Sequence, residues 1–270
     1  GFARAELYDR VIENLKISSP IRKLASTTTI SSNVLELLVQ NGEFDSGWVA
    51  EKAERPVTAN SKVKNKQIHV HEIYSQPKAT QRLLSDSCIN IEEWITSQIV
   101  DSFSKAENEA FISGDGVNKP KGILTCEDIE KVKVEEAGKI GFEDIINLIN
   151  ALDEVYQSNA SFLMNRRTMA LIQTIKDSDG RFIWQSSMAE GAPNKLFGIP
   201  VYCSNEMPIP DDGKLAIIYG DFNRGYKIVD RQGMSLMRDP FTEKPFVKFY
   251  ATKRVGGDVV DSNALKFLQL

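Results

Sequence analysis

The segment 41–78 is too polar to bury much of itself, and this constrains the chain more than any other feature. Val63 is nearly the only large apolar residue between Val57 and Ile68. From there Ile68, Val70 and Tyr74 recur on alternate positions, which is the period of a β-strand. We therefore predict two strands around a charged tip. Because an isolated hairpin is at best marginally stable in water, we expect this one to lie along another chain.

The tip of this hairpin carries charges of both signs, which suits a contact between copies of one protein. A surface ion pair contributes about 0 to 1 kcal/mol, so such pairs set register and orientation while summed burial and multivalency supply the affinity. Charged side chains also protect a strand edge from uncontrolled pairing. The alternative is a solvated surface loop. We predict an intersubunit contact through Glu51, Lys52, Glu54, Arg55, Lys62, Lys64 and Lys66.

Residues 1–40 contain no hydrophobic core of their own. Leu7, Val11 and Leu15 recur at helical spacing, and Pro20 ends that pattern. The following residues are rich in Ser and Thr, then in Leu and Val, which indicates an extended arm and a strand. We expect this arm to pack on a surface outside itself, such as a neighbouring copy.

A long amphipathic helix is predicted over 91–113. Asn90 and Glu93 fit a capping box at its start, and Gly114 follows its last turn. Its length of roughly 35 Å exceeds that of the mean globular helix of about 11 to 12 residues, so it suits a structural spine. The apolar stripe consists of Ile91, Ile95, Ile99, Phe103, Ala106 and Ala110.

The remainder of the chain mixes helices and strands, and its length of 270 residues allows one large domain or two small ones. Strands are expected at 131–135 and 161–164, with helices beginning after Gly141 and Asn165. This alternation indicates a mixed α/β (α+β) fold. Further strands, separated by Gly, Pro, Asp and Asn, are predicted at 199–203, 215–219, 226–230, 234–237 and 246–252.

Residues that would mark an enzyme or a metal site are sparse. The two histidines, His69 and His71, share one face of the expected strand, but no spacing of Cys or carboxylates completes a metal-ligand set. The turn 114–116 lacks the spacing of a phosphate loop and follows a helix. The three cysteines are far apart and form no CxxC pair. We therefore predict no catalytic residue, no cofactor and no metal.

Charge and hydropathy argue against two further classes. The formal net charge is −4, whereas a dedicated reader of nucleic acid carries a strongly basic face. No stretch approaches the roughly 20 apolar residues that a membrane span needs, so no membrane partner is expected. The chain begins at Gly1 without a Met, which we expect to reflect a trimmed tag or a processed precursor.

Four sets of stretches, taken in order and at their separations, resemble the HK97-fold family of phage major capsid proteins. They are 111–116 with 120–124, 196–201 with 207–208, 219–222 with 225–231, and 238–242 with 254–257 and 264–268. The residues that carry the motifs, and to which the resemblance gives structural roles, are Gly114, Gly116, Pro120, Gly122, Gly198, Pro200, Gly220, Asp221, Arg238, Asp239, Pro240, Arg254 and Gly256.

The resemblance implies an HK97-like fold with an axial lobe, a peripheral lobe, a long spine helix, an extended loop and an N-terminal arm. The implied division is 1–40 for the arm and first peripheral strand, 41–78 for the extended hairpin loop, 79–136 for the peripheral lobe with the spine helix 91–113, 137–230 for the axial lobe, and 231–270 for a return to the peripheral lobe.

The resemblance also implies a function: a structural major capsid subunit, not an enzyme, that self-assembles as pentamers and hexamers into an icosahedral shell. The shell would enclose double-stranded DNA without reading its sequence. Portal and scaffold or protease would act during assembly in the bacterial host cytoplasm, and the product would be the virion capsid. A gene transfer particle would use a nearly identical subunit. The alternatives are the shell of an encapsulin-type nanocompartment and, more remotely, a soluble enzyme with a site at His69 and His71.

Overall fold

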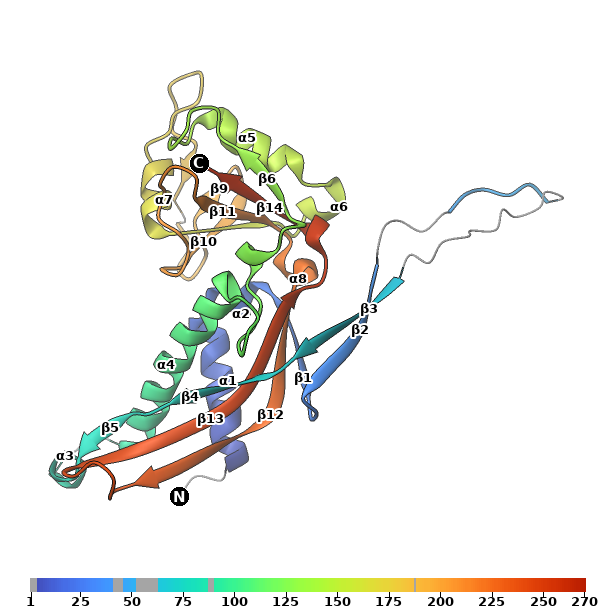
Figure 1. Cartoon of the computed structure of the whole chain (residues 1–270). Helices are drawn as coiled ribbons and strands as arrows, with labels where there is room; N and C mark the ends of the chain where they lie inside the picture. Colours follow the sequence, from blue (N-terminus) through green and yellow to red (C-terminus); the bar gives the residue numbers. More distant parts are fainter. Residues whose placement is uncertain (1–3, 41–45, 52–62, 87–89, 187) are drawn as a thin grey trace.

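The computed structural model describes residues 4–40, 46–51, 63–86, 90–186 and 188–270. Their strands form a five-stranded sheet, a seven-stranded sheet and a separate two-stranded ribbon. Figure 1 shows the two sheets at opposite ends of the molecule and the ribbon pointing away from both. The mixed α/β class predicted from the sequence is confirmed. No helix among the described residues combines the length and apolarity that a membrane crossing requires.

The five-stranded sheet is built around two long antiparallel strands. Its order is β1 (Ser26–Ile30), β12 (Tyr226–Asp239), β13 (Phe246–Val259) and β4 (His71–Ser75), and β5 (Lys78–Thr80) also pairs with β13. β1 runs parallel to β12, whereas the other pairs are antiparallel. The sheet therefore joins segments from both ends of the chain.

Strand β12 is continuous where the sequence predicts two strands, 226–230 and 234–237. Its register with β13 shifts between Arg231 and Met234, which marks a β-bulge. Gly233 adopts φ 99° there, a conformation that glycine reaches without the steric cost of a side chain. The glycine thus bends the strand without ending it, although the sequence pattern at this position is typical of a turn.

Two helices cover one face of this sheet: α1 (Arg4–Ser18) and α4 (Ile91–Ser113) (Figure 1). Leu7, Val11 and Leu15 of α1 are buried in one cluster with residues of α4, β12 and β13. Each such burial contributes about 1.5 to 3 kcal/mol. The suggestion that the arm packs on a neighbouring copy is therefore wrong for α1, whose partners lie far along its own sequence.

One half of the capping box predicted for α4, the N-cap at Asn90, is confirmed. The side chain of Asn90 accepts hydrogen bonds from the amides of Glu92, at 3.1 Å, and Glu93, at 3.5 Å. At the other end Gly114 has φ −60°, so the left-handed conformation is not what requires glycine. A Cβ there would lie 2.2 Å from the carbonyl oxygen of Pro120. The helix therefore ends where the chain folds closely back on it.

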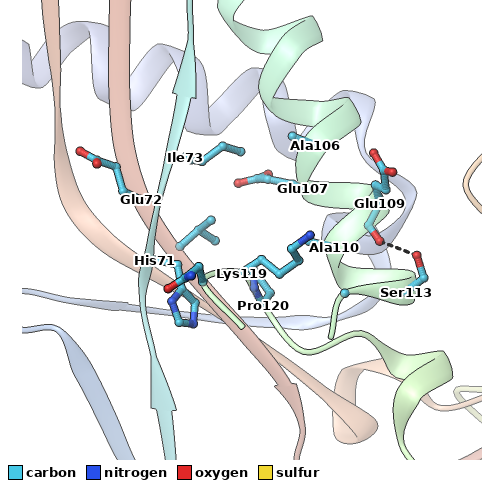
Figure 2. A pocket seen from close by; sticks show the side chains of 13 residues that line it. His71, Glu72, Ile73, Ala106, Glu107, Glu109, Ala110, Ser113, Lys119 and Pro120 are labelled. Carbon is cyan, nitrogen blue, oxygen red and sulfur yellow. Dashed lines mark hydrogen bonds between the residues drawn. The ribbon is translucent and has the colours of Figure 1, made fainter. Parts of the chain in front are cut away.

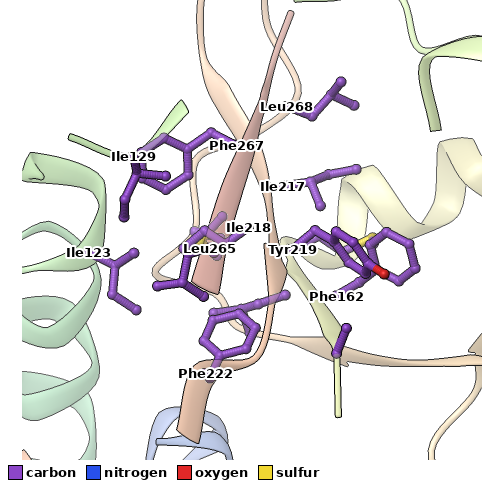
Figure 3. Close-up of a cluster of buried hydrophobic side chains, with 14 of the residues drawn as sticks. Ile123, Ile129, Phe162, Ile217, Ile218, Tyr219, Phe222, Leu265, Phe267 and Leu268 are labelled. Carbon is purple, nitrogen blue, oxygen red and sulfur yellow. The ribbon is translucent and has the colours of Figure 1, made fainter. Parts of the chain in front are cut away.

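The second sheet forms a lobe with its own hydrophobic core. Phe162, Tyr219, Phe222, Leu265 and Phe267 are among the buried side chains of this cluster (Figure 3). Its strand order is β6 (Glu130–Lys133), β14 (Leu265–Gln269), β11 (Leu215–Gly220), β7 (Ser161–Met164), β10 (Ile199–Cys203), β9 (Lys195–Leu196) and β8 (Trp184–Gln185).

The remaining helices are α2 (Pro20–Leu24), α3 (Gln81–Asp86), α5 (Phe142–Ala151), α6 (Glu154–Gln157), α7 (Arg166–Ile172) and α8 (Phe222–Gly225), with 3-10 turns η1 (Ile123–Thr125) and η2 (Ser262–Ala264).

Strand β14 departs from the division expected for 231–270. It pairs with β11 and with β6, so the last strand belongs to the seven-stranded sheet and not to the sheet that holds β12 and β13. Gly220 shows why the crossing is possible, since a Cβ there would lie 2.0 Å from the carbonyl oxygen of Ala264. The chain leaves β13 through η2 and passes directly against the end of β11.

The ribbon pairs β2 (Val34–Gln40) with β3 (Val63–His69) in antiparallel register, from Val34 opposite His69 to Gln40 opposite Val63. The projecting hairpin therefore begins at Val34, earlier than the expected 41. Its end also differs, because β4 leaves the ribbon and joins β13 in the five-stranded sheet. Strand periodicity alone could not show that β3 pairs with β2 while β4 pairs with β13, because side chains alternate between the two faces in the same way in both strands.

Candidate assembly surfaces and the buried charge cluster

The two-stranded ribbon pairs with neither of the two larger sheets. It extends away from both sheets (Figure 1). Leu38 on β2 is 77% exposed, and Trp48, beyond the end of β2, is completely exposed. Exposed large apolar side chains on a projecting element mark a surface that another molecule covers. Trp48 was not identified from the sequence, although a lone tryptophan in so polar a segment is the feature that could have revealed it.

The charged residues predicted at this surface divide into three groups. Glu51 and Lys64 are exposed, as an intersubunit contact requires. Lys66 instead lies 3.4 Å from Asp258 of β13, so it already has a partner within one chain. The other predicted contact residues, Lys52, Glu54, Arg55 and Lys62, lie outside the described residues.

The two histidines do not share a strand. His69 ends β3 and His71 begins β4, where burial, then His69 and Arg254, lower the pKa of His71. His71 lines a cavity of about 360 Å³ between β4 and α4, and Glu107 of the helix is also among the lining residues (Figure 2). Among the described residues no group of three or more His, Cys, Asp or Glu side chains is placed to hold a metal ion.

A cluster of four buried charges lies beneath this cavity, and no sequence pattern indicated it. Arg22 of α2 donates from Nε and Nη2 to Glu107 of α4, at 2.9 and 2.8 Å. It also donates from Nη1 and Nη2 to Asp230 of β12, both at 2.8 Å. Lys253 of β13 also donates to Oε2 of Glu107. Two cations and two carboxylates thus join two helices to the sheet, with every charge paired.

The pairing outweighs the cost of burial at Glu107. Burial alone would raise the pKa of this carboxyl, but the positive charges of Arg22 and Lys253, together with their hydrogen bonds, lower the pKa to about 2. The same carboxylates raise the pKa of Arg22 well above its usual value, although burial opposes this. Glu107 and Arg22 are therefore both charged at neutral pH.

Acid is expected to weaken the fold through this cluster. Because the pKa of Glu107 is lower in the folded chain than its ordinary 4.5, its contribution is complete above that pH and is lost as the pH falls toward 2. The free energy of unfolding of the unassembled subunit, measured by urea denaturation between pH 6 and pH 2.5, should fall across this window. Glu107→Gln should show a shallower fall. An unchanged slope in that variant would contradict the assignment.

The glycines after α4 hold a turn. Gly116 has φ 82°, and the amide of Gly122 donates to the carbonyl of Gly114 at 2.8 Å. A Cβ on Gly122 would lie 2.5 Å from the amide nitrogen of Ser113. With Pro120 against Gly114, the loop closes on the helix end.

Other motif residues lie where chain segments cross. A Cβ on Gly256 would lie 2.3 Å from the carbonyl oxygen of His69, so β13 passes directly against the base of the ribbon. Gly198, φ 76°, turns β9 into β10, and Pro200 lies in β10 beside that turn. Asp221, directly after Gly220, accepts a hydrogen bond from the amide of Arg224 and begins α8. The fold thus has no room for a side chain at Gly256, whereas Gly198, Pro200 and Asp221 lie at or next to turns and element ends.

The remaining motif residues lie at and along the long hairpin of β12 and β13. Asp239 accepts hydrogen bonds from the amides of Phe241, at 2.9 Å, and Thr242, at 3.1 Å. The side chain of Thr242, then these amides, lower the pKa of Asp239. Arg238 and Pro240 flank it at the hairpin tip, and Arg254, on β13, faces Glu72 and Arg231 across the sheet.

Comparison with known proteins gives one family along the whole chain. A family model described as the phage capsid family matches residues 2–270. The major capsid protein of Escherichia phage T5 is 22% identical over 263 residues, which cover 91% of this chain and 57% of the relative. The chain thus spans a little over half the length of that curated relative.

Solved capsids have the same fold. The capsid of an empty GTA particle, computed with C5 symmetry, is 39% identical, with a TM-score of 0.81 over 93% of this chain and 89% of the other. The capsid of the native GTA particle is 40% identical, with a TM-score of 0.79 over the same shares. A virus-like particle from Pyrococcus furiosus is 15% identical, with a TM-score of 0.60 over 97% of this chain and 98% of the other, and shares the fold alone.

Proposed function

The chain belongs to the phage capsid family, and from this we propose that it is the major capsid subunit of a phage or GTA shell. The observation that carries the proposal is the match to the GTA capsid, at 39% identity over 93% of the chain. The projecting ribbon supports it, because exposed Leu38 and Trp48 need a cover that the described part of the chain does not provide.

The extended hairpin is the proposed contact with a neighbouring copy. Glu51 and Lys64 are available on its described part, and Lys52, Glu54, Arg55 and Lys62 would act with them at the tip. The individual ion pairs are weak, so the contact depends on many copies and on the burial of apolar side chains along the ribbon. In the proposed shell the subunits associate into pentamers and hexamers.

The two sheets correspond to two lobes with different places in the shell. The lobe of the seven-stranded sheet would lie around the five-fold and six-fold axes, and the five-stranded sheet with α1 and α4 would form the peripheral lobe. α4 would be the spine that connects them. In this assignment β14 and β6 belong to the axial lobe, which shifts the boundaries expected from the sequence.

The shell would enclose double-stranded DNA by confinement. A net charge of −4 is compatible with this role, because confinement needs no strongly basic face. Portal and scaffold or protease would act on the subunit during assembly in the bacterial host cytoplasm, and the virion or GTA particle would be its final location. The role needs no catalytic residue, cofactor, metal or membrane.

An encapsulin-type compartment is the second candidate, and the likeness to the Pyrococcus furiosus particle favours it. At 15% identity and a TM-score of 0.60 that likeness is weaker than the likeness to the GTA capsids. The two candidates differ in content, because a phage or GTA shell holds DNA and an encapsulin holds a cargo protein. The ratio of absorbance at 260 and 280 nm of particles purified from their natural source separates them.

Expression of the chain should yield closed particles of uniform size. We expect them in negative-stain electron microscopy and as a fast species in analytical ultracentrifugation, since heterologous contacts that close produce finite shells. The measurement should cover a range of protein concentration and salt, because assembly depends on both. A chain that stays monomeric under all these conditions would refute the proposed function.

A further inference from the structure

Two exposed corners of the seven-stranded lobe carry opposite charge. One corner is the start of α6, where Asp153 and Glu154 are exposed and Val155 is 57% exposed. The other is α7, whose Arg166 and Arg167 are exposed. Figure 1 shows α6 and α7 at opposite edges of the lobe, so the two corners of one chain do not meet each other.

The acidic corner is held rigidly, although it is only one helical turn. The side chain of Asp153 accepts a hydrogen bond from the amide of Val155 at 3.0 Å and so caps α6. Next to it Tyr156 donates to Asp261 at 2.7 Å, and Arg224 stacks over its ring at 4.9 Å. Val155 is therefore an exposed apolar side chain in a fixed position, directly after the two carboxylates Asp153 and Glu154.

The basic corner contains a hollow of about 470 Å³ next to α7. Ala170 and Ile209, which is 40% exposed, supply apolar surface to it, and Arg166 and Arg167 line it as well. Asn165 holds the hollow in place through two hydrogen bonds. Its side-chain oxygen accepts from the amide of Arg167 at 2.9 Å and so caps α7, and its side-chain nitrogen donates to the carbonyl of Met207 at 3.0 Å. Within the described part of the chain neither arginine has a carboxylate at ion-pair distance.

A ring of identical subunits brings unlike edges together. In a cyclic assembly each contact is heterologous, so one edge of a subunit meets the opposite edge of the next. The GTA capsid that this chain resembles at 39% identity was computed with C5 symmetry. Opposite charges on the two edges favour this arrangement and disfavour contact between two like edges.

We propose that the α6 corner of one subunit docks in the α7 hollow of the next subunit around the ring. Val155 would lie on the apolar surface of Ala170 and Ile209, and Glu154 would pair with Arg166 or Arg167. The occupant of the hollow is therefore a second copy of this chain. The inference rests on the proposed shell function and adds to it the residues that join axial lobes.

The surface beside the α6 corner supports the same arrangement. A groove of about 780 Å³ lies between the ribbon and this corner, and Leu38 and Val155 both line it. A neighbour that covers Val155 with its α7 edge enters this groove and also covers Leu38, which is otherwise 77% exposed. One copy thus covers the apolar residues of two separate elements.

The test is a charge reversal on each corner. Glu154→Arg is chosen because Asp153, which caps α6, stays intact. Arg166→Glu with Arg167→Glu reverses the other corner, and acidic residues in the first turn of α7 are compatible with its helix dipole. The third chain carries all three changes, so that every ring contact again joins opposite charges. All are produced as full chains and compared with wild type by ultracentrifugation, electron microscopy and circular dichroism.

Each single-corner variant should fold as wild type but reduce the fraction of protein in closed particles by about tenfold or more, since it places like charges in every ring contact. The triple variant should recover most of that fraction. If the substituted residues only stabilised their own lobe, the triple variant would not recover assembly. The two corners lie at opposite edges of one chain, so a change at one corner could compensate for a change at the other only through contact between subunits. Normal assembly of both single-corner variants, or failure of the triple variant to recover, would overturn the docking while wild-type shells still supported the proposed function. A wild-type chain that forms no particles would overturn both.

Discussion

Arg22→Met should lower the free energy of unfolding by about 3 to 5 kcal/mol, because it removes one partner from a buried set of ion pairs. Asp230 would lose both of its side-chain hydrogen bonds from Arg22, and Glu107 would keep Lys253 alone. The side chains of Arg22 and Glu107 are completely shielded from solvent, so water cannot replace the lost partner. Methionine fills a similar volume and limits the effect of a cavity.

Urea denaturation of the unassembled subunit, followed by circular dichroism, measures this loss at neutral pH. Arg82→Met is the matched control, since Arg82 pairs with Asp86 at 3.6 Å on an exposed helix face. That change should cost no more than about 0.5 kcal/mol. Equal effects of the two substitutions would show that the buried cluster does not hold α2 and α4 to the sheet.

Replacing residues 41–62 by an Asn-Gly turn should abolish closed particles and leave the subunit folded. Gln40 and Val63 face each other at the end of the ribbon, so a two-residue turn can join β2 to β3. The deletion removes the charged tip and Trp48, and spares the buried side chains of both sheets. Its free energy of unfolding should therefore stay within about 0.5 kcal/mol of wild type.

Electron microscopy and ultracentrifugation measure the loss of shells, and the unfolding curve verifies the fold. Co-expression with wild type provides the control, because a shortened chain keeps the surface that receives a neighbour's hairpin. Shortened chains should enter mixed particles in a small proportion. Normal shells made from the shortened chain alone would show that this segment is a solvated loop, which is the alternative interpretation of its polarity.

Local chemistry made the spine helix predictable. The bounds 91–113 and the cap at Asn90 follow from apolar spacing and from a side chain that satisfies free amides at the helix start. The strand at Ser161–Met164 and the cap at Asn165 were predictable for the same reason. In each case the residues that determine the element lie within a few positions of one another.

The arm and the charge cluster were not predictable in this way. Arg22 pairs with Glu107 across 85 positions and with Asp230 across 208. In the sequence each is an ordinary charged residue, and such residues lie at the surface unless a partner is brought to them. The burial of Leu7 and Val11 has the same cause, since their partners are on α4, β12 and β13.

The sequence by itself determined the helices α1, α4, α5 and α7, most strands, the mixed class and, through its motifs, the family. Only the tertiary structure decided that α1 packs on its own chain, that β14 joins the seven-stranded sheet, and that the corners at α6 and α7 have opposite charge. Periodicity and capping act over a few residues, and the sequence shows them directly. Burial, ion pairing and strand register depend on which distant segments meet, and the chain settles that only when its long-range contacts form together.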